Sequence, residues 1–155
     1  MSTVCETSAR VRRLVFARAF GFCEGCGTSV IGRPYTIATR VVRDTGGATR
    51  ADVTALWNLT LLCGSADRPG GCQLLREQQD EQLHERGLWL RWWEDARLAP
   101  VWLANPERPR IPVWLNGEGT YDFEAPSGDR ARRRARRRPD RFQRPAHLSG
   151  HWLTA

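Results

Sequence analysis

The spacing of apolar positions divides the first half of the chain into short elements. Residues 8–20 repeat apolar residues at helical spacing and stop at Gly21, which predicts a helix with Arg18 off its apolar face. Residues 34–43 are rich in β-branched residues and predict a strand. Residues 59–62 form a short apolar run that predicts a second strand or turn.

The second half of the chain continues this mixture of helices and strands. Residues 72–86 fit one helix with a polar face, and residues 88–93 predict a strand. Residues 100–104 and 112–116 predict two more strands, the latter leading through an Asn-Gly turn into a hairpin. Helices and strands mixed in this way predict an α+β fold.

Composition separates a globular body from a tail. The chain has 155 residues, of which 41% are hydrophobic and 26% charged, enough apolar material for one modest domain. We assign residues 1–125 to this domain and residues 126–155 to a tail without core-forming pattern. No apolar run approaches a membrane span, and the N-terminal residues lack the apolar segment of a secretory signal. A cytoplasmic, reducing location is therefore expected.

The net charge lies almost entirely in the tail. All 24 basic residues are arginine, and residues 129–144 hold nine of them with two aspartates, a net charge of +7. The other fifteen arginines are balanced by fifteen acidic residues. We expect the tail to be disordered alone and to bind DNA or RNA with little sequence preference, although a solvated charge run and an acidic protein partner remain alternatives. The arginines expected to contact phosphate are Arg132, Arg133, Arg134, Arg136, Arg137 and Arg138.

Two cysteine pairs provide the strongest chemical signal. Cys23 and Cys26 form a CxxC turn, and Cys63 and Cys72 follow as a second pair on a glycine-rich loop. Four thiolates on two short loops are the usual ligands of a structural Zn²⁺. Free cytosolic thiols and a redox-active CxxC are the alternatives, but this CxxC follows a helix instead of opening one. Cys5 is expected to be a bystander.

Four motifs follow one another along the body of the chain. They are VRRLVFARAFGFCEGCG, TIATRVVRDTGG, NLTLLCG and GGCQLLRE. In order and spacing they resemble the zinc-containing HNH endonucleases of actinobacteria and their phages. The resemblance implies a small zinc-stapled ββα-metal domain of the His-Me finger type with extra C-terminal strands. The absence of lysine agrees with such a source.

The same resemblance assigns three catalytic positions, and this chain lacks the family's histidine at two of them. The general base of the family is a histidine, where this chain has Thr39. The orienting asparagine is retained as Asn58, and the metal-binding histidine becomes Gln73. Threonine lacks a basic nitrogen, and a neutral amide is a poor ligand for a metal that must compete with water. We therefore expect vestigial positions and do not expect a catalytic divalent metal.

Other residues offer only indirect replacements. Histidine occurs elsewhere, at one position in the predicted 72–86 helix and two in the tail, and none is expected to fill the site: His84, His147 and His151. Three loop aspartates offer carboxylates for Mg²⁺, although solvated loop acids are the simpler interpretation: Asp44, Asp52 and Asp67.

These observations predict a nucleic-acid-binding protein with a degenerate HNH-like site. Arg40 and Arg43 are expected to contact phosphate on the former substrate face. One alternative is an active, metal-dependent endonuclease with an atypical site. Another is a non-enzymatic accessory or inhibitor protein that binds another protein through its tryptophan-rich strands. The seven tryptophans are expected mainly in the core, with base stacking as the alternative, and oligomeric state is not indicated.

Overall fold

The computed structural model describes residues 7–41, 53–68, 70–104 and 110–127. Within these ranges the fold mixes helices and short strands, which confirms the predicted α+β class. The elements are α1 (Ala9–Arg18), β1 (Tyr35–Thr39), the 3-10 helix η1 (Leu56–Asn58), β2 (Leu59–Cys63), α3 (Gly71–Glu77), α4 (Glu81–Glu85), β3 (Val101–Trp102), β4 (Pro112–Leu115) and β5 (Tyr121–Asp122). No helix in the described part of the chain is long and apolar enough to cross a bilayer.

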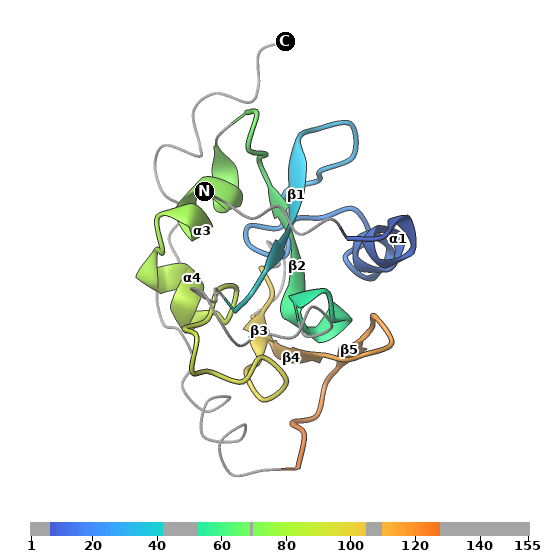
Figure 1. The fold of residues 1–155 in the computed structure, drawn as a ribbon, viewed down its shortest axis with the longest axis vertical. Helices are drawn as coiled ribbons and strands as arrows, with labels where there is room; N and C mark the ends of the chain where they lie inside the picture. Colours follow the sequence, from blue (N-terminus) through green and yellow to red (C-terminus); the bar gives the residue numbers. More distant parts are fainter. Residues whose placement is uncertain (1–6, 42–52, 69, 105–109, 128–155) are drawn as a thin grey trace.

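An antiparallel pair of strands forms the centre of the molecule. β1 and β2 pair from Tyr35 opposite Cys63 to Thr39 opposite Leu59. Helix α1 lies on one side of this pair, and α3 and α4 lie on the other (Figure 1). Because both faces of β2 are covered, its first four residues are all buried, Thr60 among them. Together, β1, β2 and α3 form a ββα unit.

Helix α1 begins and ends where the sequence predicts. The Ser8 side chain accepts a hydrogen bond from Val11 N at 3.3 Å and caps the first turn. After Arg18 the chain leaves the helix through Phe20, with φ +51°, and Gly21, with φ +69°. The expectation that Arg18 lies off the buried face is wrong, because only 6% of its surface is exposed.

A second small sheet closes one end of the fold. β4 pairs in antiparallel fashion with β3 and with β5, and the β4–β5 pairing confirms the predicted hairpin. The turn between β4 and β5 is held by Asn116, whose Oδ1 accepts hydrogen bonds from Glu118 N and Thr120 N. An asparagine side chain that bonds its own turn in this way explains why the Asn-Gly signal marks a hairpin.

Two predicted elements differ from the structure. The expected single helix over residues 72–86 is split into α3 and α4, because Gln79 adopts a left-handed φ of +54° and Asp80 caps the next helix. The Asp80 Oδ1 accepts from Gln82 N and Leu83 N, so a second helix start replaces continuation. Residues 88–93 are not a strand; only Leu90 forms an isolated parallel bridge, with Val41.

Candidate metal centre and the neighbouring ββα site

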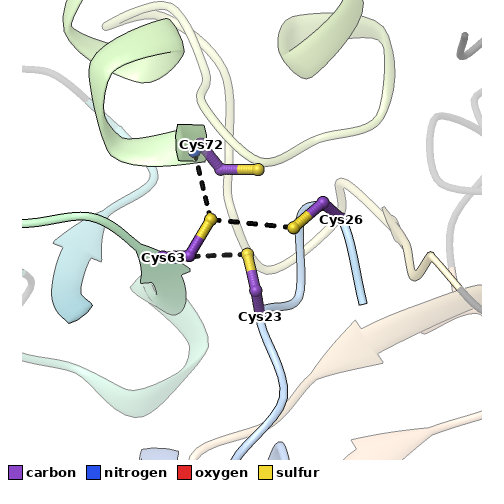
Figure 2. A group of neighbouring side chains, drawn as sticks. All are labelled: Cys23, Cys26, Cys63 and Cys72. Carbon is purple, nitrogen blue, oxygen red and sulfur yellow. Dashed lines mark hydrogen bonds between the residues drawn. The ribbon is translucent and has the colours of Figure 1, made fainter. Parts of the chain in front are cut away.

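The four predicted cysteines lie together in one cluster. Their Sγ atoms are all within 4.8 Å of one another (Figure 2). The Cys26 and Cys63 sulfurs are 3.6 Å apart, and all four cysteines are free of disulfides. Zn–S bonds of about 2.3 Å in a tetrahedron place sulfurs about 3.8 Å apart. The cluster therefore has the dimensions of a four-thiolate metal site.

Three pieces of local structure place the four sulfurs. Cys23 and Cys26 lie on the turn after α1, Cys63 ends β2 and Cys72 lies in the first turn of α3 (Figure 2). The Cys63 backbone N–H donates to the Cys23 sulfur at 3.2 Å, and the Cys72 N–H donates to the Cys63 sulfur at 3.3 Å. Such N–H donors stabilise thiolates over thiols, as a metal ligand requires.

Two glycines let the backbone approach the sulfurs. A Cβ atom at Gly25 would lie 2.8 Å from the Cys72 sulfur. A Cβ atom at Gly71, where φ is +63°, would lie 2.6 Å from the Cys63 sulfur. Neither position has room for a larger residue without moving a ligand. The glycine-rich sequence around the cysteines is therefore a packing requirement of the cluster.

A buried ion pair between Arg18 and Glu24 holds the CxxC turn in place. Glu24, between the first two cysteines, is 3% exposed and accepts two hydrogen bonds from the Arg18 guanidinium, at 3.1 and 3.2 Å. The same carboxylate accepts from Leu61 N at 2.7 Å and from the Tyr121 hydroxyl at 2.6 Å. These contacts fasten the turn to α1, β2 and β5.

The electrostatics of the cluster also fit a cation. Burial raises the pKa of the Cys23 thiol, and its hydrogen bond with Cys23 raises the pKa of Cys72. Hydrogen bonds with Cys23 lower the pKa of the Cys26 and Cys63 thiols. Only some of the four sulfurs therefore ionise easily without a positive charge nearby. A divalent cation removes this conflict, because it favours the thiolate at every position.

The donor set decides what kind of metal site this is. Four sulfurs and no carboxylate or imidazole make a soft set, and four ligands complete a tetrahedron. No coordination position is left for water or substrate, so the cluster fits a structural role. The described residues contain no other group of three or more metal-binding side chains.

A cation contacts Thr39, the residue that the resemblance aligns with the catalytic base. Arg76, on α3, donates from Nη2 to the Thr39 carbonyl at 2.6 Å and from Nε at 3.0 Å. The Nη2 atom also lies 3.0 Å from the Thr39 hydroxyl. Burial lowers the pKa of Arg76. A guanidinium stays protonated in proteins at neutral pH. This contact ties α3 to the end of β1.

Asn58 holds the backbone at the same end of the strand. It is 4% exposed, and its Oδ1 accepts a hydrogen bond from Val41 N at 3.0 Å. Its carbonyl accepts from Arg40 N at 2.7 Å. Asn58 therefore positions the residues that leave β1. Orientation of this loop is one role that the resemblance implies for the asparagine.

Gln73 is a buried neutral amide at the start of α3. It is 6% exposed, and its Nε2 donates to the Glu77 carboxylate at 3.0 Å. Its Oε1 has no hydrogen-bond partner among the described residues. The side chain supplies one neutral oxygen where the resemblance expects an imidazole nitrogen. It is therefore a weak ligand for a catalytic metal.

The expectation that Arg40 contacts phosphate is wrong. Arg40 is completely buried, and its guanidinium donates to four backbone carbonyls. The acceptors, at 2.6 to 3.2 Å, are those of Gly87, Trp57, Ala96 and Ala99. A buried arginine that satisfies carbonyls from several loops is a structural cross-link, and its charge is inaccessible to a nucleic acid.

The remaining candidate residues divide into described and undescribed positions. Asp67 is exposed on the loop between Cys63 and Cys72. His84 lies on α4, whereas Gln73 lies on α3. The His84 Nε2 is 2.7 Å from a Glu94 carboxylate oxygen. The candidates outside the described residues are Arg43, Asp44, Asp52, the six tail arginines, His147 and His151.

Sequence patterns alone did not identify three residues that support these sites. Glu24, Arg76 and Arg86 are charged, and a pattern analysis places charged residues on the surface. Arg86 is fully buried, donates to the Trp102 carbonyl at 2.8 Å, and has its pKa lowered to about 10 by burial. The one available signal was the position of Glu24 inside the CxxC turn.

Comparisons of the chain with protein-family models, with curated proteins and with solved structures found no significant match. The resemblance to HNH endonucleases accordingly rests on the sequence motifs alone.

Proposed function

We propose that this protein binds nucleic acid without cutting it, on a zinc-stabilised HNH-like domain whose catalytic site is degenerate. The observation that carries this proposal is the Arg76 guanidinium bonded to Thr39. It is a fixed positive charge where an HNH nuclease needs a neutral base and a nearby divalent cation. Like charges repel, so this arrangement disfavours a catalytic metal and favours a phosphate.

Zinc is the metal that we assign to the four-cysteine cluster. The soft donor set, the tetrahedral dimensions and the closed coordination support this assignment. In this role the ion joins the turn after α1, the end of β2 and the start of α3. Zinc supplies charge neutralisation and a fold constraint there, and no reaction step. A cytoplasmic location, where thiols stay reduced, belongs to the same proposal.

The tail arginines supply most of the proposed affinity. Residues 129–144 carry a net charge of +7, whereas residues 1–128 are neutral overall. Neutralising phosphates with such a segment releases counterions, which makes binding strong at low salt and nearly independent of sequence. Arg43, which lies outside the described residues, is retained as a proposed phosphate contact, and Arg40 is not.

A salt titration with matched charge variants tests the proposal. One variant replaces Arg136, Arg137 and Arg138 with glutamine, and the control replaces the exposed α1 residues Arg10, Arg12 and Arg13. Both variants lose three positive charges. Fluorescence anisotropy on labelled DNA and RNA should give a log–log salt slope shallower by about two to three for the tail variant. The control should change the slope by less than one unit.

Two outcomes contradict this proposal. Equal slopes for the two variants would mean that the tail does not carry the phosphate contacts. Undetectable binding of full-length protein at low salt would remove the nucleic-acid function altogether.

A second candidate function is binding to another protein. It is favoured by an apolar surface patch beside the cysteine cluster, where Phe20 is 80% exposed, Ile31 66% and Phe22 49%. Apolar side chains gathered on a surface mark interaction sites more often than isolated ones do. A partner retained at high salt by the wild type and released by Phe20→Ser would support this candidate.

A further inference from the structure

A cavity lies between the end of β1 and the loop that joins α4 to β3. Its volume is about 390 Å³, within the range of ligand-binding pockets. On one side it is bounded by Asn58 and by Val41. The Val41 N–H donates to the Asn58 Oδ1. The described residues that line it are Val41, Val53, Trp57, Asn58, Trp92, Trp93, Glu94, Asp95, Ala96 and Arg97. We call this the tryptophan pocket.

Two of its aromatic side chains are left open to solvent. Trp92 is 66% exposed and Trp93 is 63% exposed, the largest apolar side chains in the described structure that are left so open. Their ring centroids are 5.4 Å apart with an interplanar angle of 90°. In this edge-to-face arrangement the pair covers one of its four ring faces, and Arg91 lies over the Trp93 ring. Flat faces therefore remain available for another planar ring.

Arginines lie over the aromatic rings of the pocket. The Arg97 guanidinium is 5.7 Å from the Trp57 ring centroid, and Arg91 is 5.7 Å from that of Trp93. Arg97 is held in place by two hydrogen bonds to the Asp95 carboxylate, at 2.9 and 3.0 Å. Aromatic faces bordered by guanidinium groups are the combination with which proteins bind single-stranded nucleic acids.

We propose that the tryptophan pocket takes an unpaired nucleobase, which stacks on Trp92 or Trp93. The inference rests on the proposed nucleic-acid binding, because the tail brings the polyanion to the protein and the pocket then selects its bases. A neutral nucleobase suits this pocket better than a phosphate, because Glu94 and Asp95 line it beside Arg97. The net charge of +7 on the chain attracts the phosphates of the same strand. In a duplex the bases are already stacked on each other, so the pocket favours single strands.

An oligonucleotide without bases separates stacking from phosphate contacts. The probes are a labelled 12-nucleotide oligothymidylate, its uridine counterpart and an abasic oligomer of the same length and charge. We expect full-length wild type to bind both base-containing probes about 5- to 100-fold more tightly than the abasic one. This ratio should hold as salt rises, because stacking releases no counterions.

Variants locate the stacking surface. Trp92→Ala and Trp93→Ala together should reduce the ratio to near one while leaving abasic binding unchanged. The matched control is Phe123→Ala, which removes another exposed aromatic side chain, 68% exposed and outside the pocket. It should leave the ratio intact. Because Trp92 and Trp93 are mostly exposed, their removal should also leave the thermal unfolding midpoint nearly unchanged.

The remaining outcomes overturn the inference in distinguishable ways. If wild type binds the abasic and base-containing oligomers equally, the pocket takes no base, while the proposed phosphate binding stands. An equal loss of the ratio in the Phe123→Ala control would also assign stacking elsewhere. If none of the three probes binds at low salt, the proposed function fails together with the pocket.

Discussion

The cysteine cluster lies on the same small ββα unit as Thr39, Asn58 and Gln73, but only the cluster offers a set of metal ligands. Cys72 and Gln73 are neighbours at the start of α3, and Asn58 and Cys63 bracket β2. In the cluster, all four sulfurs lie within 4.8 Å of one another and form a complete ligand set. At the neighbouring positions, an arginine contacts a threonine and a glutamine is buried as a neutral amide.

The cysteine cluster and the contacts at the end of β1 have different roles in the fold. The ββα unit needs the cluster, because β1, β2 and α3 are too short to be stable alone. The end of β1 is fixed without histidine, because Arg76 donates to the Thr39 carbonyl and the Asn58 Oδ1 accepts from Val41 N. The cysteine cluster and the end of β1 are therefore held by separate sets of contacts.

Removal of one ligand should have the largest effect. Cys63→Ser should release the metal and unfold the domain, because structural zinc contributes about 10 kcal/mol or more to small metal-dependent folds. Elemental analysis should give about one zinc per wild-type chain and almost none in the variant. Cys5→Ser is the control and should keep both metal and fold. Wild type that is folded and free of metal would contradict the assignment.

The ion pair under the CxxC turn should matter next. Glu24→Gln leaves the buried Arg18 charge without its partner, and we expect a loss of about 3 kcal/mol in the free energy of unfolding. The control is Asp95→Asn, which breaks the exposed pair with Arg97 and should cost less than about 1 kcal/mol. Denaturant unfolding of zinc-loaded protein measures both. Equal losses would show that burial does not distinguish the two pairs.

Replacement of the buried Arg40 should have the next largest effect on stability. Arg40→Gln should destabilise the protein by about 2 kcal/mol or more, because buried carbonyls lose charged donors. The exposed Arg33→Gln serves as the control and should be nearly neutral. Neither change should alter the affinity of folded protein for DNA by more than about twofold. A stable Arg40 variant that binds DNA weakly would restore the phosphate-contact role.

Rebuilding the nuclease positions should have the smallest effect. Thr39→His with Gln73→His supplies both missing imidazoles, but Arg76 still occupies the space beside residue 39. We therefore expect no nicking by this double variant and weak Mn²⁺-dependent nicking only when Arg76→Ala is added. Time courses on supercoiled plasmid measure the rates. Cleavage by the double variant at the rate of the triple variant would mean that Arg76 does not block the site.

Sequence patterns predicted the parts of this molecule that depend on residue identity. The cysteine cluster followed from ligand spacing, and β1, β2 and the C-terminal hairpin followed from β-branched residues and turn signals. Buried arginines could not be found in this way, because their partners are backbone carbonyls distant in the sequence, such as Arg40 with Ala96. The break between α3 and α4 was missed for a different reason, because it depends on a local cap: the Asp80 Oδ1 accepts from Gln82 N and Leu83 N.

One assay tests directly whether this chain combines a structural metal site and nucleic-acid binding with the absence of nuclease activity. Zinc-loaded wild type is incubated with supercoiled plasmid and Mg²⁺, Mn²⁺ or Ni²⁺, and one gel reads binding while a deproteinised gel reads nicking. The account predicts retarded plasmid that is covalently intact with every metal. Metal-dependent nicking by wild type, abolished by Asn58→Ala under conditions where that variant stays folded, would contradict it and identify an active nuclease.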